Sequence, residues 1–169
     1  SARSTYPAQF MLVAAMNPCP CGNYGSRITP CRCTAQQIQR YRNRISGPML
    51  DRIDIHVEMG EVGYNDIAGR SCGEPSSAIR ARVNAARAIQ TRRYAGMGIL
   101  FNAQLTNRMM NQYCVLTSDA ESLMKKAFAA LKLSARAYTR LLKVSRTIAD
   151  LAGSEQIKAE HIAEAIQYR

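Results

Sequence analysis

The sequence predicts an α/β segment followed by an all-α subdomain, and three patterns support this prediction. The continuous apolar run Phe10–Met16 has the length of a strand that is covered on both faces, as in a parallel sheet. The run Ile53–Glu58 alternates apolar and polar residues, as does a strand with one buried face. In the second half of the chain, apolar residues recur three or four positions apart, which is the spacing of an amphipathic helix.

A stretch rich in glycine separates the two parts. Residues 60–75 contain four glycines and end in Pro75, and this composition is typical of a linker. We therefore predict three regions along the chain: the α/β part at residues 1–59, the linker at residues 60–75 and the helical subdomain at residues 76–169.

Helices are expected in both parts. In the α/β part, Thr34 precedes the segment Ala35–Asn43 and is suited to cap it. In the helical part, capping residues and a terminal glycine mark the ends of apolar stripes. These stripes are Ile79, Val83, Ala86 and Ile89 after Ser76; Leu123, Ala127 and Leu131 after a capping box that begins at Ser118; Ala137, Leu141, Val144, Ile148 and Leu151, ended by Gly153; and Ile162, Ala165 and Ile166. A further helix is expected around residues 103–112.

Asn17 directly follows the first apolar run, and Pro18 favours an extended conformation for it and ends the strand. In open α/β sheets, ligands bind at the carboxyl ends of the strands. A side-chain amide at such a place can donate a hydrogen bond to a phosphate or orient a water molecule. Asn17 is therefore a candidate catalytic residue, and a turn-forming asparagine is the alternative interpretation.

The chain is strongly basic, with a formal net charge of +11. Nearly all charged residues before Arg52 are arginines, and a second group without acidic residues runs from Arg80 to Arg93. This distribution favours nucleic acid or nucleotide phosphate as a partner. A solvated basic surface or a contact with an acidic neighbouring subunit are the alternatives. No apolar run approaches the ~20 residues of a membrane span, so we expect a cytoplasmic protein with no membrane partner.

Two C-x-C pairs, nine residues apart, carry four thiols: Cys19, Cys21, Cys31 and Cys33. Four thiols so close together in a protein expected in the cytoplasm indicate a soft tetrahedral metal, most simply Zn²⁺. Because four thiolates close the coordination shell, such a metal would be structural. Four free thiols or two labile disulfides are the alternatives. Cys72 and Cys114 lie apart and are expected to be small apolar residues.

Two arginines are candidates for contact with phosphate. Arg52 lies just before the second predicted strand, where it could reach a phosphate of a neighbouring subunit or pair locally with Asp51 and Asp54. Arg136 falls in the first turn of a helix that Ser134 is suited to cap, where the helix dipole favours an anion. If an anion docks at this helix start, the positive charge of Arg136 is favourable there. Alternatively, Arg136 is simply exposed to solvent, and its unfavourable interaction with the helix dipole costs the protein little stability.

Several parts needed for nucleotide hydrolysis are absent from the sequence. It contains no G-x-x-x-x-G-K-[ST] motif, and no apolar run ends in an acidic pair that could hold Mg²⁺. His56 and His161 have no evident catalytic partners, and we expect the first on a strand and the second on a helix surface. This chain alone therefore lacks the residues required to hydrolyse a nucleotide.

A set of longer motifs runs through nearly the whole chain. They are Tyr6-Pro7-Ala8, Leu12–Gly22, Arg40-Tyr41, Arg44–Asp54, Leu133–Tyr138, Arg140, Thr147–Leu151, His161-Ile162 and Ala165–Arg169. In this combination the chain resembles the Mg-chelatase-like AAA+ ATPases of the ComM/YifB type. The resemblance implies an α/β nucleotide-binding core followed by a helical lid, so that residues 1–59 would be a remnant of the AAA+ core and residues 76–169 the lid.

The resemblance also implies roles for the three candidate residues. Asn17 matches sensor 1, the polar residue that orients the attacking water near the γ-phosphate. Arg52 matches the arginine finger, which is donated to the ATP of the adjacent subunit in a ring. Arg136 matches sensor 2, which contacts the ATP phosphates from the start of a lid helix.

As to activity, the resemblance implies hydrolysis of ATP with Mg²⁺ by a hexameric ring that remodels DNA, for example by branch migration. The Walker A and Walker B motifs of the family are absent from this sequence, and we expect them upstream of it. We therefore expect this chain alone neither to hydrolyse ATP nor to bind it tightly. The alternatives are the ATPase subunit of a metal chelatase that acts on a tetrapyrrole, and a static zinc-knuckle module that binds nucleic acid.

Overall fold

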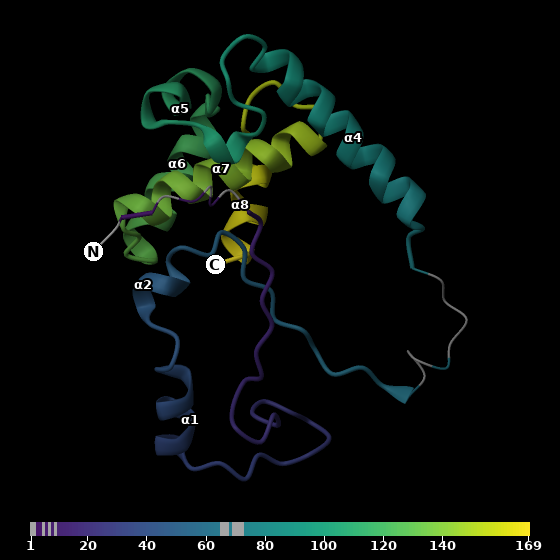
Figure 1. Cartoon of the computed structure of the whole chain (residues 1–169), viewed down its shortest axis with the longest axis vertical. Helices are drawn as coiled ribbons and strands as arrows, with labels where there is room; N and C mark the ends of the chain where they lie inside the picture. The colour runs from purple at the N-terminus through teal and green to yellow at the C-terminus, as the bar shows by residue number, and fades with distance from the viewer. Residues whose placement is uncertain (1–2, 5, 7, 9, 65–67, 69–72) are drawn as a thin grey trace. The chain divides into compact units, whose positions relative to one another are not determined.

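The computed structural model describes residues 3–4, 6, 8, 10–64, 68 and 73–169 (Figure 1). The chain divides into two compact units, Ser1–Gly47 and Pro48–Arg169. Cys72, which we expected to be a small apolar residue, lies outside the described residues, as does part of the predicted linker. Among the described helices, none combines the length and the apolar character that crossing a membrane requires.

Among its described residues, the first unit has an irregular segment before Pro18, a cysteine-containing loop and the short helix α1 (Ala35–Arg42). The Oγ1 atom of Thr34 accepts a hydrogen bond from the N–H of Gln37 at 3.2 Å, and Gln37 Oε1 accepts one from the N–H of Thr34 at 2.9 Å. This capping box confirms the predicted helix start. No residue of α1 is buried, and Cys19 is the one buried residue among those described in this unit. The described residues of this unit therefore form no hydrophobic core.

The strand predicted at Phe10–Met16 is not formed, and the prediction is corrected. These residues are unpaired and lie in solvent, with Phe10 77% and Val13 83% exposed. A continuous apolar run predicts burial, but a strand also needs neighbouring backbone with which to exchange hydrogen bonds. The described part of the chain supplies no such neighbour and has a single isolated bridge, Leu116 to Ile157.

The second predicted strand, Ile53–Glu58, is also absent from the structure. This segment is instead fixed to the helices of the second unit. The backbone N–H of His56 donates to the carbonyl of Tyr168 at 2.9 Å, and Asp54 Oδ1 lies 3.0 Å from Nη1 of Arg140. Residues 48–59, which we assigned to the α/β part, thus belong by their contacts to the second unit.

The second unit is all-α in its described residues, as predicted for the carboxyl-terminal part. Its helices are α2 (Gly47–Leu50), which begins at the boundary, α4 (Ser76–Arg93), the 3₁₀ helix η1 (Asn102–Gln104), α5 (Asn107–Tyr113), α6 (Ser118–Ala130), α7 (Ala135–Leu151) and α8 (Ala159–Gln167). Helix α7 packs against α4, α5, η1 and α8, and α6 packs against α8 (Figure 1). The helix expected at residues 103–112 is realised as η1 and α5.

The core of the second unit lies between α6, α7 and α8. Leu141 of α7, Met124 of α6 and Ile162 of α8 are each at most 2% exposed, and Ile157 closes the core from the loop before α8. The predicted stripe of α7 faces this core except at its end, where Leu151 is 40% exposed. Burial of these side chains supplies about 1.5–3 kcal/mol each.

Two predicted helix starts differ from the structure by one residue. The N-cap of α6 is Thr117 and not Ser118, and its Oγ1 atom accepts from the N–H of Ala120 at 3.4 Å. The N-cap of α4 is Pro75 and not Ser76, and it makes no side-chain hydrogen bond to the helix. In α6 a threonine directly before the serine offers the same hydroxyl chemistry, so composition alone does not distinguish the two.

The end of α7 is set by Gly153, as predicted. Its φ angle of +66° lies in the left-handed region. The N–H of Gly153 donates to the carbonyl of Asp150 at 3.1 Å, and that of Ser154 to Ala149 at 2.8 Å. This pair of hydrogen bonds is the Schellman motif, which satisfies carbonyl groups at the helix end.

A buried polar cluster joins α4, η1 and α7 around the carboxylate of Asp150, which is 2% exposed. Arg93 donates to both carboxylate oxygens at 2.5 and 2.9 Å, and Arg146 Nε donates at 3.1 Å. Asn102 and Gln90 complete the cluster at 2.8 and 3.2 Å. Burial alone would raise the pKa of Asp150, but the hydrogen bonds from Arg93 and Asn102 and the charge of Arg146 hold this pKa below its ordinary value.

His161 is buried, with 3% exposed, which corrects the expectation of a helix-surface residue. Its Nδ1 atom accepts a hydrogen bond from the N–H of Lys158 at 3.0 Å and so caps α8. An imidazole nitrogen that accepts a hydrogen bond carries no proton. Burial, together with the charges of Lys158 and Arg146, lowers the pKa of His161 and favours this neutral form.

Candidate metal centre and nucleotide-contacting residues

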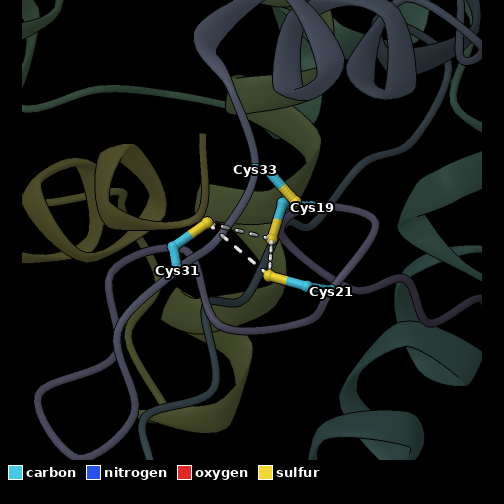
Figure 2. Close-up of side chains that lie close together, drawn as sticks. All are labelled: Cys19, Cys21, Cys31 and Cys33. Atoms are coloured by element: carbon cyan, nitrogen blue, oxygen red, sulfur yellow. Dashed lines mark hydrogen bonds between the residues drawn. The ribbon is translucent and has the colours of Figure 1, made fainter.

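The four predicted metal-ligating cysteines lie together in the first unit (Figure 2). The sulfur of Cys19 is 3.4 Å from that of Cys21 and 3.7 Å from that of Cys31, and the sulfurs of Cys21 and Cys31 are 3.6 Å apart. The sulfur of Cys33 completes a group in which all four atoms are within 4.8 Å of one another. Residues from both C-x-C pairs thus converge on one point.

The three separations among the sulfurs of Cys19, Cys21 and Cys31, 3.4–3.7 Å, are close to the edges of a zinc tetrahedron. A Zn–S bond of about 2.3 Å requires sulfurs about 3.8 Å apart in tetrahedral geometry. They do not match a disulfide, whose sulfurs are about 2.05 Å apart, and all four cysteines are free thiols in the structure. The geometry therefore fits a four-thiolate metal centre and argues against the disulfide alternative.

A tight turn brings the first C-x-C pair into this position. The N–H of Gly22 donates to the carbonyl of Cys19 at 3.0 Å, and Gly22 has a φ angle of +83°. A residue with a Cβ atom is strained in this conformation. Gly22 thus lets Cys19 and Cys21 direct their sulfurs to the same point despite the short spacing between them.

The close thiols influence each other's ionisation. Backbone N–H groups of Asn23 and Arg32 stabilise the thiolate of Cys21 and lower its pKa to about 6. Loss of solvation and the neighbouring thiols raise the pKa of Cys33 to about 12. Ionisation of Cys21 is therefore favoured, whereas ionisation of Cys33 is opposed. A divalent cation at the centre would remove this opposition, because metal ligation deprotonates the thiols.

Asn17 lies in the first unit, directly before the cysteine loop. It is exposed, and its backbone belongs to no helix or strand. Its side chain has no hydrogen-bond partner among the described residues. The amide is therefore free to contact a ligand.

Arg52 lies in the second unit, at the turn after α2, and is exposed. Its Nη1 atom donates to the carbonyl of Pro48 at 2.8 Å. The local ion pairs that we considered are not formed, because Asp54 lies against Arg140 at 3.0 Å and Asp51 faces Arg169 at 3.9 Å. The acidic neighbours of Arg52 are thus occupied by other arginines.

Arg136 is exposed in the first turn of α7. Ser134 caps this helix as predicted, since its Oγ atom accepts from the N–H of Ala137 at 3.1 Å. The guanidinium of Arg136 makes no ion pair within the described part of the chain. The structure therefore brings the four cysteines together, whereas Asn17, Arg52 and Arg136 each face solvent on separate segments.

One group of residues was missed by sequence reasoning. A hollow of about 600 Å³ beside the cysteine loop is lined by Arg32 and by residues of α1 and its end, among them Arg40, Tyr41 and Arg44. The signal was the spacing of these α1 positions, which places them on one helical face. We had counted them only as part of the basic charge and of the longer motifs.

Comparison with known proteins agrees with the sequence motifs. Residues 73–169 match the family model described as "Magnesium chelatase, subunit ChlI C-terminal", and residues 1–67 match "Magnesium chelatase, subunit ChlI". The two matches meet between residues 67 and 73, inside the predicted linker. The first match alone covers more than half of the chain.

Two similar proteins extend over the same range. The chain is 44% identical over 170 residues to the competence protein ComM of Haemophilus influenzae, and 43% identical over 169 residues to the uncharacterized protein YifB of Salmonella typhimurium. These alignments cover 99–100% of this chain and 32% of each relative, so the chain spans about a third of their length. The chain belongs to the Mg-chelatase-like AAA+ family of the ComM/YifB type.

Proposed function

We propose that this chain contributes part of the ATP site of a AAA+ motor that hydrolyses ATP with Mg²⁺ and acts on DNA. The observation that carries the proposal is the pair of matches to the magnesium chelatase models, which together run through nearly the whole chain. Of the three proposed site residues, Asn17 and Arg136 have no side-chain hydrogen bond or ion pair among the described residues, and Arg52 has a side-chain hydrogen bond to the carbonyl of Pro48 but no carboxylate partner there. The basic charge of +11 supports DNA as the partner.

Arg52 is the proposed arginine finger. A finger must leave most of its donors available, because it has to reach phosphate oxygens of ATP held by a neighbouring copy in the ring. Arg52 uses Nη1 for the carbonyl of Pro48, and Asp51 and Asp54 face other arginines. Its charge therefore remains available to stabilise the negative charge of the transferring phosphoryl group.

Arg136 is the proposed sensor 2 residue. The first-turn N–H groups of α7 and the helix dipole favour an anion near Arg136, and the guanidinium adds a positive charge at the same end. Asn17 is the proposed sensor 1 residue, whose amide would orient the attacking water. The exposed side chains of both residues support these assignments.

The cysteine cluster is the proposed zinc centre, held by Cys19, Cys21, Cys31 and Cys33. Because all four ligand positions are taken by the protein, the metal would fix the loop and would not take part in hydrolysis. The free thiols among the described residues also support a place in the cytoplasm, where thiols remain reduced.

The finger assignment is tested in the protein expressed from its complete reading frame. We expect Arg52→Ala to lower ATP turnover about 10³-fold or more while leaving ATP affinity unchanged, as for other fingers. Arg108→Ala, which removes another exposed arginine of the same unit, is the matched control and should retain turnover. Equal turnover by the two variants would refute the finger assignment.

The sensor 2 assignment makes a different prediction for Arg136→Ala. Because Arg136 would contact the phosphates of bound nucleotide, the variant should bind ATP about tenfold more weakly, the effect of one lost charge-assisted contact. Isothermal titration calorimetry with a non-hydrolysable ATP analogue measures this affinity. Unchanged affinity in Arg136→Ala would remove the residue from the proposed site.

The second candidate function is the ATPase subunit of a metal chelatase, which the description of the matched family models favours. The two candidates differ in their dependence on DNA. A DNA motor should turn over ATP faster when DNA is added, and this stimulation should fall steeply with salt. An ATPase of a chelatase should be indifferent to DNA.

A further inference from the structure

We propose that the hollow between the cysteine loop and α1 is a binding groove for single-stranded DNA. The inference rests on the proposed action on DNA. It adds where on the chain the DNA binds and that the bound DNA is single-stranded. The groove is defined by its lining residues: Pro20, Cys21, Arg32, Cys33, Gln37, Arg40, Tyr41 and Arg44. All of them belong to the first unit.

One face of α1 forms a wall of this groove. Gln37, Arg40, Tyr41 and Arg44 are spaced three, one and three positions apart, so they lie in one stripe along the helix and its end. In a helix that packs on a core, such a stripe is apolar. Here it carries two arginines and a tyrosine, and α1 has no buried residue. This face is therefore not covered by a hydrophobic core and is available to a charged ligand.

The cysteine loop also lines the groove and adds a third arginine. Arg32 lies between Cys31 and Cys33, so its backbone is held wherever the sulfur cluster is held. The N–H of Arg32 itself stabilises the thiolate of Cys21. The proposed zinc centre would thus fix the backbone of Arg32 at the groove.

The charge of the groove is not neutralised by the protein. The first 47 residues contain six arginines and no lysine, aspartate or glutamate. Within the described residues, Arg32, Arg40 and Arg44 have no carboxylate partner. In the second unit, by contrast, several arginines are in ion pairs with acidic residues: Arg82, Arg93, Arg140, Arg146 and Arg169. The groove arginines are therefore available to a polyanion.

Tyr41 favours a single strand over a duplex. It lines the groove, and the guanidinium of Arg44 lies 5.9 Å from the centre of its ring. An aromatic ring between cations can stack on an unpaired base while the arginines contact the phosphates on either side. The bases of a duplex are already stacked on each other and do not offer their faces to a side chain.

The experiment measures binding of a fluorescent oligothymidine to this chain by anisotropy at several salt concentrations. The triple variant Arg32→Ala, Arg40→Ala, Arg44→Ala should bind at least about tenfold more weakly, and the slope of log K against log salt should fall by about 2, because each phosphate contact on a single strand contributes about 0.7. Tyr41→Ala should lose affinity on the order of tenfold with an unchanged slope, since it removes stacking and no charge.

The matched control removes the same charge from the second unit. Arg108, Lys126 and Lys132 are exposed, lie outside the basic group from Arg80 to Arg93, and have no carboxylate partner among the described residues, so their triple alanine variant should keep most of the affinity and the slope. The variant Arg40→Lys, Arg44→Lys should also keep the slope, because the charges remain. Far-UV circular dichroism verifies that α1 is retained in each variant.

The outcomes separate this inference from the proposed function. If the unmodified chain binds DNA and the control triple weakens binding as much as the groove triple, the groove is overturned while a DNA-acting protein remains. Tighter binding of a duplex of the same length also overturns the groove, as does clearly tighter binding of the matching RNA. If the unmodified chain and the protein from its complete reading frame both fail to bind any DNA, the proposed action on DNA is overturned as well.

Discussion

The two units of this chain reach a defined structure by different means. In the first unit the one buried residue among those described is a cysteine, and four sulfurs converge at its centre. The second unit has a continuous apolar core and a buried carboxylate that holds two arginines. A small segment that cannot bury enough apolar surface needs a cross-link or a metal, whereas a helical unit of larger size does not. The comparison predicts that the two units respond to different perturbations.

Removal of metal should have the largest effect and should act on the first unit alone. Structural zinc contributes apparent binding free energies of about 10–16 kcal/mol in small domains, which no other contact in this unit can replace. We expect a strong chelator, or Cys21→Ser, to abolish protection of the amides in residues 18–34 from hydrogen exchange. The melting temperature of the helices in the second unit should not change.

Cys114→Ser is the matched control for this prediction. Cys114 is 7% exposed in the core of the second unit, as we expected of a small apolar residue, and burial raises its pKa to about 11. The variant should lower the melting temperature of the second unit without changing metal content. Loss of metal in Cys114→Ser, or unchanged amide protection after chelation, would contradict the division between the units.

The next largest effect is expected from Asp150→Ala, which acts on the second unit. The variant leaves the buried guanidinium of Arg146 and the partly buried guanidinium of Arg93 without their carboxylate, and such a loss costs about 3–5 kcal/mol. The exposed pair Glu121–Lys125, at 2.8 Å, provides the control, because Glu121→Ala should cost at most about 0.5 kcal/mol. Urea unfolding followed by circular dichroism measures both. Similar losses of unfolding free energy in the two variants would show that the buried cluster around Asp150 does not stabilise the second unit.

The depressed pKa of Asp150 gives this prediction a pH dependence. The stabilisation is complete above the ordinary aspartate pKa of about 3.9 and is lost as the pH falls through the lower value in the folded protein. Asp150→Ala should therefore lose less stability, relative to the unmodified chain, at low pH than at pH 7. An equal loss at both pH values would argue against an ionised carboxylate.

Two glycines allow the units to be compared with one type of substitution. Gly22 and Gly153 have φ angles of +83° and +66°, and a Cβ at either would meet no atom within 4 Å. Alanine at each position therefore introduces left-handed strain of about 1–2 kcal/mol and no clash. Gly22→Ala should weaken metal affinity roughly tenfold, whereas Gly153→Ala should lower the unfolding free energy of the helical unit. Gly47→Ala, where φ is not positive, is the control for both.

The smallest effect is expected from protonation of His161. Its Nδ1 atom accepts from Lys158 only when neutral, and the protonated ring loses this cap. Because burial lowers its pKa in the folded protein, stability should decline as the pH falls below the ordinary histidine value of about 6.5. The decline should be about 1 kcal/mol, the worth of one cap. A variant His161→Gln that still declines equally between pH 7 and pH 5 would contradict this role.

The sequence predicted α7 well, because local signals determine it, but the predicted apolar stripe of α4 is buried only in part, since Ile79 and Val83 are 41% and 44% exposed. Ser134, Gly153 and the stripe through Leu141 set the limits and the buried face of α7, and each acts within a few residues. It did not predict the buried cluster, since Arg93 and Asp150 are far apart along the chain and charged residues are ordinarily exposed. It also placed His161 on the surface, because the capping role of an imidazole has no signature in the spacing of apolar residues.

In the first unit the sequence predicted the sulfur cluster and failed on the strand. Two C-x-C pairs define a ligand set by residue type, so their convergence could be expected before the fold was seen. The run Phe10–Met16 has the composition of a buried strand, but a strand depends on partners elsewhere in a protein. The described residues supply none, and the run remains unpaired.

The most direct test of this account is the metal content and coordination of the purified chain. Elemental analysis should find one zinc per chain, and X-ray absorption at the zinc edge should find four sulfur neighbours at about 2.3 Å. The claim that sulfur ligation replaces a hydrophobic core in the first unit would be contradicted by a chain that carries no metal and has four freely titratable thiols, if the amides of residues 18–34 in that chain are still protected from hydrogen exchange.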